Sequence, residues 1–454
     1  MRILTIVTIV TLTVSAPLAA QDSTAIPLDY FAAQQRLLEQ SDAIAASQAN
    51  VRGKEAQAGA TSSLGRPEVD FEAQLLDYQK TLYLPLGSLR PIAESFGIED
   101  PLRFRRHETA IRPIVTATLP LYSGGRITGT QAGARAQLEQ ARAERTGTVN
   151  KALLQLAQAY YGQQLAEQAL GVRRDVLAGL DRHVADAIKL EREQFISRAQ
   201  RLQAEVARDD AAREFEKAVA DLATANIALA ALLRAPRGVR PATPLFVISQ
   251  PLEPLETYQA AALNSHPELD RLRALGAEAE AGVTIQKSEQ RPTIYGFGQY
   301  NFDRRDALLT DPDWTVGIGL RYKLASGLGR NQAVEAARQA ALQAQSGLQE
   351  ARTQIEVGVA KAWNEAEAAR RRFLLLDSSL ELAGENLRLQ SLSYREQQAT
   401  SLDVIDAELG LGRARIQHVQ AAYDYVMALA QLLDLGGEIA RLPDYIVRAD
   451  KEVP

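Results

Sequence analysis

The residue types that most often carry out chemistry are few in this sequence, and their spacing matches no catalytic or metal-binding pattern. The chain of 454 residues has no cysteine, which excludes thiolate metal sites, a cysteine nucleophile and disulfides. The four histidines have no close metal-ligand spacing with one another: His107, His183, His266 and His418. Two glycine clusters, Gly124-Gly125 and Gly327-Leu328-Gly329, lack the full fingerprint of a phosphate-binding loop. No Ser/His/Asp or paired-carboxylate constellation stands at a recognisable spacing, so we predict no catalytic residue, no metal site and no cofactor.

The N-terminus has the pattern of a secretory signal peptide. Arg2 is followed by an apolar stretch and then by a run of small residues that ends at Ala20, so we predict that residues 1–20 are removed on export. The net charge of -5 is mild and the charged residues are interspersed, which does not indicate nucleic-acid binding. Hydrophobic residues make up 46% of the chain but aromatic residues only 6%. This composition favours long helices that pack closely.

The chain runs twice through the same order of features. We predict a first repeat over residues 21–253, with strands at about 67–78 and 108–121 and a helical hairpin at about 126–235. The second repeat covers residues 254–435, with strands at about 292–303 and 313–324 and a hairpin at about 330–435. Residues 436–454 form a C-terminal tail. The two glycine clusters lie at matching joints between strand and helix.

Alternating apolar and polar residues in the strand segments point to a membrane. In the last segment, Trp314, Val316 and Ile318 alternate with Thr315 and Gly317, which places one whole face in an apolar medium. A strand of about ten residues, tilted near 45°, covers the roughly 25 Å apolar band of an outer-membrane barrel. Four strands cannot close a barrel, and an open edge in hydrocarbon is costly, so we predict a homo-oligomer that pools its strands. A small soluble sheet with one core face is the alternative.

The helical segments are predicted to be unusually long. No proline lies between Pro120 and Pro236 or between Pro312 and Pro443, so nothing forces a helix to stop there. From Ile355 to Tyr394, small or apolar residues follow a four-three spacing that is typical of a coiled-coil seam. Possible capping boxes begin at Ser197 and Thr400. We therefore place the tips of the two hairpins just before these two residues.

The repeat, the joint Tyr122-Ser123-Gly124-Gly125-Arg126 and the stretch from Tyr394 through Thr400-Ser401-Leu402-Asp403-Val404-Ile405-Asp406-Ala407 resemble the TolC-type outer membrane efflux proteins, also called outer membrane factors. The resemblance covers essentially the whole mature chain. It implies an α+β membrane protein in which each chain gives four transmembrane strands to a shared 12-stranded barrel. A long periplasmic α-helical coiled-coil barrel and an equatorial region, formed by about residues 236–254 and the tail after Gly436, would complete it.

The same resemblance implies a function and partners. The protein would be a homotrimer in the outer membrane, surrounded by outer membrane lipid, and would extend its helices into the periplasm. It would serve as the passive channel of a tripartite efflux or type I secretion system, together with a periplasmic adaptor (membrane fusion) protein and an inner-membrane pump. The alternative from another class is a secreted structural coiled-coil scaffold of the envelope. A scaffold has no need for the strand alternation and would stay soluble without detergent.

The resemblance also implies roles for three residues near the second hairpin tip. Asp403 and Asp406 match aspartates that close the periplasmic aperture in the family, and residues three apart share a helix face. Asp403 is alternatively a helix cap, and Asp406 an exposed acidic residue. Tyr394 matches a tyrosine that holds the closed tip, although it also fits the coiled-coil seam as ordinary packing. The glycine usual at the family's tips is replaced by Gln194 and Gln397.

Overall fold

The computed structural model describes residues 25–302, 312–324 and 329–453. The predicted signal peptide and part of the second glycine cluster lie outside these residues. The chain divides into two compact units, one of residues 1–42, 150–258 and 359–454 and one of residues 43–149 and 259–358. Two long helices, α4 (Arg126–Arg192) and α8 (Arg330–Arg395), contribute to both units.

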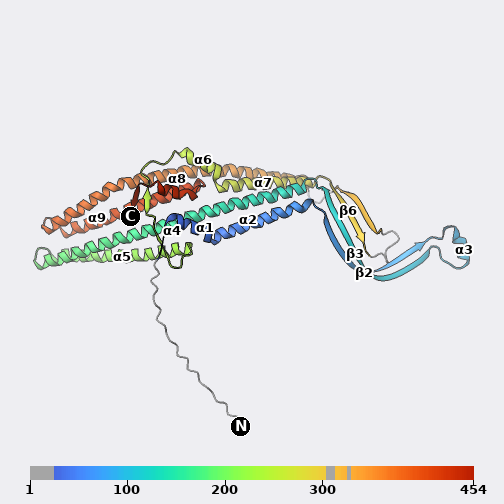
Figure 1. The fold of residues 1–454 in the computed structure, drawn as a ribbon, viewed down its shortest axis with the longest axis horizontal. Helices are drawn as coiled ribbons and strands as arrows, with labels where there is room; N and C mark the ends of the chain where they lie inside the picture. Colours follow the sequence, from blue (N-terminus) through green and yellow to red (C-terminus); the bar gives the residue numbers. More distant parts are fainter. Residues whose placement is uncertain (1–24, 303–311, 325–328, 454) are drawn as a thin grey trace, which may run out of the picture. The chain divides into compact units, whose positions relative to one another are not determined.

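The unit of residues 43–149 and 259–358 is built on an antiparallel sheet in the order β2-β3-β6-β7 (Figure 1). The strands are β2 (Glu68–Leu84), β3 (Leu102–Tyr122), β6 (Thr293–Asn301) and β7 (Trp314–Arg321). A strand lies at each of the four places where the sequence predicts one. The pairing of β2 with β3 continues past the predicted ends, through the apolar pair Leu82 and Phe104, to Leu84 and Leu102.

Helices lead into and out of this sheet. Residues 85–101 join β2 to β3 and contain η2 (Gly87–Leu89) and α3 (Arg90–Ser95). The unit also holds α7 (Pro267–Ser288), η1 (Ser62–Gly65), the first turns of α4 and α8, and α2 (Asp42–Thr61) from Ala43 on. Val51 of α2 is buried against Leu138 and Ala141 of α4. Alanine at such contacts lets two helices approach closely.

The joint between β3 and α4 explains the first glycine cluster without a bound phosphate. Gly124 and Gly125 have φ angles of 67° and 103°, which glycine adopts at no steric cost. A Cβ atom on Gly124 would lie 3.0 Å from the Ser288 carbonyl oxygen and from the Arg291 Cβ. The Ser123 hydroxyl accepts a hydrogen bond from the Ile127 amide at 3.2 Å. The cluster therefore turns the chain from strand to helix where α7 passes closely.

The other unit contains the parts of two helical hairpins that include the tips. One hairpin is α4 with α5 (Arg198–Leu232), and the other is α8 with α9 (Ser401–Leu435). With 67 residues, α4 is about 100 Å long at 1.5 Å per residue. The predicted coiled-coil seam of α8 is turned inward: Val359 and Ala366 are fully buried and Phe373 is 1% exposed. In the described part of the chain, no helix combines the length and apolarity that crossing a membrane requires.

Short strands and helices surround the middle of these hairpins. β1 (Ile26–Leu28) pairs with β4 (Val239–Pro241), and β5 (Leu245–Val247) pairs with β8 (Lys451–Val453). The strands β4, β5 and β8 lie in the segments that are predicted to form the equatorial region. The helical pieces are α1 (Tyr30–Gln40), α6 (Leu255–Ser265), η3 (Ile439–Arg441) and α10 (Leu442–Val447). They enclose an aromatic core, in which Tyr30 stacks on Tyr161 and Tyr160 meets both rings edge to face, with ring centroids 5.3 to 5.4 Å apart.

Candidate functional site

One face of the four-stranded sheet is apolar from edge to edge. The strand register places side chains from all four strands on this face: Val69, Phe71, Ala73 and Leu75 of β2, Ile111, Pro113, Val115, Ala117 and Leu119 of β3, Ile294 and Tyr300 of β6, and Trp314, Val316, Ile318 and Leu320 of β7. Those of the edge strands β2 and β7 are exposed, with Leu75 71% and Ile318 75% exposed, and most of those on the central strands are half-buried. Exposed apolar surface of this extent marks a face that another apolar medium covers.

The opposite face of the sheet is more polar. It carries Glu68, Asp70, Glu72 and Gln74 on β2 and Thr116, Thr118, Gln299, Thr315 and Arg321 on the other strands. Two aromatic rings also lie here, and each covers a glycine of β7. A Cβ on Gly317 would lie 2.9 Å from Phe297, and one on Gly319 would collide with Tyr295. The sheet is therefore two-sided, as a wall between hydrocarbon and water requires.

The sheet has two open edges. In the described residues β2 and β7 each have one neighbouring strand, because the order β2-β3-β6-β7 ends with them. Backbone amides and carbonyls on the far side of each edge strand have no strand to pair with. In hydrocarbon each unsatisfied group costs several kcal/mol. A single chain is therefore incomplete as a membrane structure.

The two hairpin tips share one turn design. Phe195 and Gln398 donate amide hydrogen bonds to carbonyls five residues back, at 2.9 and 2.8 Å, which is the Schellman end of an α-helix. The residues before them, Gln194 and Gln397, have φ angles of 63° and 61°. These are the two glutamines that replace the family's tip glycines, so each adopts the left-handed conformation that glycine ordinarily supplies.

A capping box follows each Schellman end, as the sequence predicts. The Ser197 hydroxyl accepts from the Gln200 amide at 3.4 Å, and the Gln200 side chain accepts from the Ser197 amide at 3.0 Å. In the second tip the Asp403 amide donates to the Thr400 hydroxyl at 3.3 Å, and the Asp403 carboxylate accepts from the Thr400 amide at 2.7 Å. Both predicted boxes and both tip positions are confirmed.

The three residues singled out near the second tip differ in burial. Asp403 and Asp406 are both exposed, on the side of α9 away from the buried Val404 and Ile405. Hydrogen bonds from the Thr400 hydroxyl and amide hold the pKa of the Asp403 carboxyl below its usual value. Tyr394 is 4% exposed, and burial raises the pKa of its phenol. The capping role of Asp403 and the packing position of Tyr394 are thus present in a single chain.

A buried polar contact joins the two hairpins beside Tyr394, and the sequence gives no sign of it. The His183 Nε2 of α4 lies 2.8 Å from the Ser401 hydroxyl of α9, and the His183 ring centroid lies 4.9 Å from that of Tyr394. Ser401 in turn donates to the Gln200 carbonyl at 3.4 Å, so His183 is the donor to Ser401 in this arrangement. Burial lowers the pKa of His183, although the nearby Asp186 opposes this effect.

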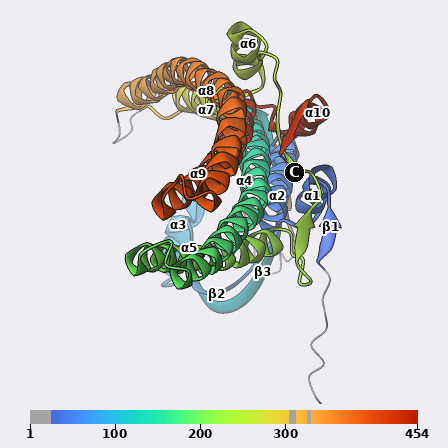
Figure 2. The same cartoon turned by 90° about the vertical axis from the view of Figure 1, so that its left-hand side faces the viewer.

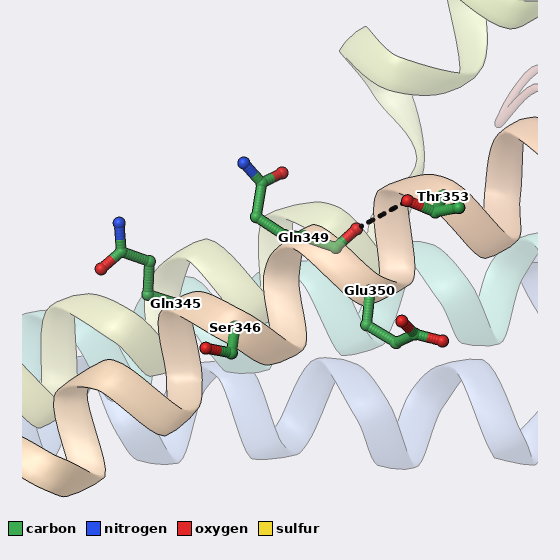
Figure 3. Close-up of a pocket in the computed structure, with 5 residues that line it drawn as sticks. All are labelled: Gln345, Ser346, Gln349, Glu350 and Thr353. Atoms are coloured by element: carbon green, nitrogen blue, oxygen red, sulfur yellow. Dashed lines mark hydrogen bonds between the residues drawn. The ribbon is translucent and has the colours of Figure 1, made fainter.

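No other described feature resembles a chemical site. Figure 3 shows a surface pocket on α8 lined by Gln345, Ser346, Gln349, Glu350 and Thr353, whose side chains do not converge on one point. The Thr353 hydroxyl donates to the Gln349 carbonyl at 3.2 Å, a common arrangement within a helix. The described residues contain no group of three or more His, Cys, Asp or Glu side chains able to hold a metal ion.

The fold is that of solved outer-membrane channels. A crystal structure of CusC superposes with a TM-score of 0.75 at 15% identity, covering 91% of this chain and 93% of CusC. The Campylobacter jejuni CmeC outer membrane channel superposes with a TM-score of 0.73 at 12% identity, covering 89% of this chain and 85% of CmeC. The fold shared with these structures is therefore a four-stranded sheet joined to long helical hairpins.

Sequence comparison gives the family. Residues 259–438 match the model of the outer membrane efflux protein family. Protein CyaE of Bordetella pertussis is 26% identical over 267 residues, which cover 56% of this chain and 56% of CyaE. The match thus spans about half the length of this curated relative. Residues 259–438 thus resemble the outer membrane efflux protein family, and the described chain as a whole shares the fold of the solved channels.

Proposed function

We propose that three copies of this chain form a passive channel through the outer membrane. The observation that supports this proposal most directly is the four-stranded sheet, which has an apolar band across one face of all four strands and two unpaired edges. Three such sheets joined edge to edge give a closed barrel of twelve strands, with the apolar faces toward lipid and the polar faces toward the lumen. Closure pairs the edge amides and carbonyls that a single chain leaves open.

The helical hairpins support the same assembly. On α8 a second apolar stripe, separate from the buried seam, consists of Leu375, Leu382 and Leu389, which are 74%, 70% and 46% exposed. The three leucines repeat every seven residues, as coiled-coil positions do. They would pack against a helix of the next subunit and so form a ring of helices in the periplasm.

The proposed role is transport without catalysis. Substrates would pass from an inner-membrane pump, through a periplasmic adaptor protein, into the helical ring and out through the barrel, as in tripartite efflux or type I secretion. The pump would supply the energy, and the channel would bind no cofactor. The scaffold alternative does not account for the apolar sheet face, because a soluble spacer would have no medium to cover it.

Asp403 and Asp406 are proposed to line the periplasmic aperture. Both carboxylates lie on the exposed side of α9, so three subunits would bring six of them toward one axis. A ring of carboxylates attracts cations and repels anions. Tyr394 is proposed to hold the tip closed through its buried contact with the other hairpin.

The test is single-channel conductance of the purified mature protein in a planar bilayer, after its mass in detergent has been measured. Discrete, cation-selective openings from a trimer are the expected result. The variant Asp403→Asn/Asp406→Asn removes both charges while asparagine can still accept the capping bond, and should reduce cation selectivity; Asp221→Asn, on the exposed side of α5, is the control. A soluble monomer without conductance would refute the channel. Unchanged selectivity in the double variant would remove the two aspartates from the aperture.

A further inference from the structure

The hairpin of β2 and β3 is too long for the membrane alone. β2 has 17 residues and β3 has 21, whereas a strand tilted near 45° crosses the apolar band with about ten residues. In contrast, β6 has 9 residues and β7 has 8. The pairing of β2 with β3 is continuous to Leu84 and Leu102. Nine residue pairs beyond Leu75 and Ile111, where the apolar face ends, therefore stand outside the apolar band as regular sheet.

The register shows which side chains of this extension continue the lipid-facing surface. Cross-strand partners share a face, and every second pair lies on the same side. Beyond the apolar pair Leu75 and Ile111, the same face carries the pairs Asp77 with Thr109, Gln79 with His107, Thr81 with Arg105 and Tyr83 with Arg103. The surface thus changes along one strand from apolar residues to three basic residues at positions 103, 105 and 107.

The charges on this face are only partly compensated. His107 Nε2 lies 3.0 Å from the Asp77 carboxylate. For Arg103 and Arg105 the described residues provide no carboxylate partner, and both side chains are exposed. The Arg103 guanidinium lies over the Tyr83 ring, 5.9 Å from its centroid, a cation–π arrangement that fixes its direction. Two arginines with about 7 Å between them along the strand remain available to an anion.

We propose that Arg103 and Arg105, with Tyr83 beside them, bind the phosphate groups of phosphorylated glycolipids in the outer leaflet around the channel. The inference rests on the proposed function, because it requires the apolar sheet face to lie in the membrane. Guanidinium groups recognise phosphate through paired N–H donors. The site adjoins the surface that lipid tails would cover, so a lipid headgroup is the anion nearest to it.

The height of the two arginines selects the kind of lipid. Arg105 lies six residues beyond Ile111, about 20 Å along the strand and so about 14 Å outside the apolar band at a 45° tilt. The headgroup layer of an ordinary phospholipid leaflet is only about 5 to 8 Å deep. Phosphates carried on the sugars of a glycolipid reach farther out, and an arginine side chain extends back toward them. The expected ligand is therefore a phosphorylated sugar headgroup.

The test compares two variants with equal changes of charge on opposite faces of the same hairpin. Arg103→Gln/Arg105→Gln removes the proposed site. The control, Lys80→Gln/Arg106→Gln, alters a cross-strand pair on the other face. Purified trimers in detergent are titrated with a phosphorylated glycolipid, its dephosphorylated form and an anionic phospholipid, and bound lipid is counted by native mass spectrometry. Each arginine that is removed should lower the binding affinity about fivefold, so the first variant should bind the phosphorylated glycolipid roughly 25-fold more weakly than the unmodified protein. The control should bind it like the unmodified protein.

The outcomes separate this inference from the channel itself. Equal binding of the phosphorylated glycolipid by both variants, or of phosphorylated and dephosphorylated forms by the unmodified protein, would overturn the site. Preference for the phospholipid would overturn the assignment to glycolipid. Each of these results is compatible with normal conductance, which is measured on the same samples. If the unmodified protein neither forms trimers nor conducts, the proposed function fails, and the lipid site fails with it.

Discussion

A close contact between the two hairpins yields a quantitative prediction at Gly412. This residue of α9 faces α4, which lies beside α9 in Figure 2. A Cβ atom on Gly412 would lie 2.5 Å from the Val176 Cγ2, far inside van der Waals contact. Valine in a helix has one strongly preferred rotamer, so Val176 cannot turn away. Gly412→Ala must therefore push the helices apart.

The magnitude follows from comparison with a neighbouring glycine. Overpacking a buried contact costs about 1–3 kcal/mol, whereas replacing glycine by alanine within a helix gains up to about 1 kcal/mol. Gly410 lies in the same helix and has no atom within 4 Å of an added Cβ. Gly410→Ala therefore measures only the stabilisation that alanine gives a helix in place of glycine. We expect Gly412→Ala to be less stable than Gly410→Ala by about 1–3 kcal/mol.

Amide hydrogen exchange in α9 measures this difference locally, without assuming that the protein unfolds in two states. Amides around residue 412 should exchange faster in Gly412→Ala and slower in Gly410→Ala. Adding Val176→Ala removes the Cγ2 atom and should restore protection in the Gly412→Ala background. Equal protection in the two alanine variants, or no recovery with Val176→Ala, would refute the close-packing argument.

Three further predictions concern the tips and the helix ring. Gln397→Gly should stabilise its hairpin tip by about 1 kcal/mol, because glycine adopts the left-handed backbone conformation without the steric cost that glutamine has there. Gln398→Gly is the control. Equal rates of amide hydrogen exchange at the tip in the two variants would contradict this prediction. The second prediction concerns the contact between His183 and Ser401. Because burial lowers the pKa of His183 in the folded state, the neutral histidine contributes its full stabilisation above a pH of about 6.5, and this contribution decreases as the pH falls below that value. Amide exchange near Ser401, corrected for its intrinsic pH dependence, should therefore accelerate in the unmodified protein as the pH falls below this value. It should not accelerate in the His183→Gln variant. The same acceleration in both proteins would show that His183 is not the group responsible. Leu382→Asn should weaken the trimer, seen as lower mass in detergent, and an unchanged mass would exclude the stripe from the interface.

Features encoded within a few neighbouring residues were predictable from the sequence. Each capping box lies within four residues, and the coiled-coil seam is a simple period, so both predictions agree with the structure. The contact between His183 and Ser401 joins residues separated by 218 positions. Neither residue belongs to a local motif, so only the packing of α4 on α9 brings them together.

The long hairpin was harder to predict for a different reason. Apolar alternation ends at Leu75 and Ile111, and the next residues on that face are charged or polar. A pattern search for membrane strands stops where the apolar pattern stops. Backbone pairing does not, because sheet hydrogen bonds need no apolar face. The tip glutamines are a similar case, since nothing in their side chains signals a positive φ.

The two tips together form an internal comparison that bears on Asp403. Both capping boxes have the same geometry, but the third helical residue is the neutral Gln200 in the first tip and Asp403 in the second. Gln200 accepts the amide bond at 3.0 Å and Asp403 at 2.7 Å, so the turn forms with or without a charge. The helix dipole favours an acid at this position only modestly when it is exposed. The fold therefore does not require the negative charge of Asp403, which is consistent with the role at the periplasmic aperture that we propose for this carboxylate.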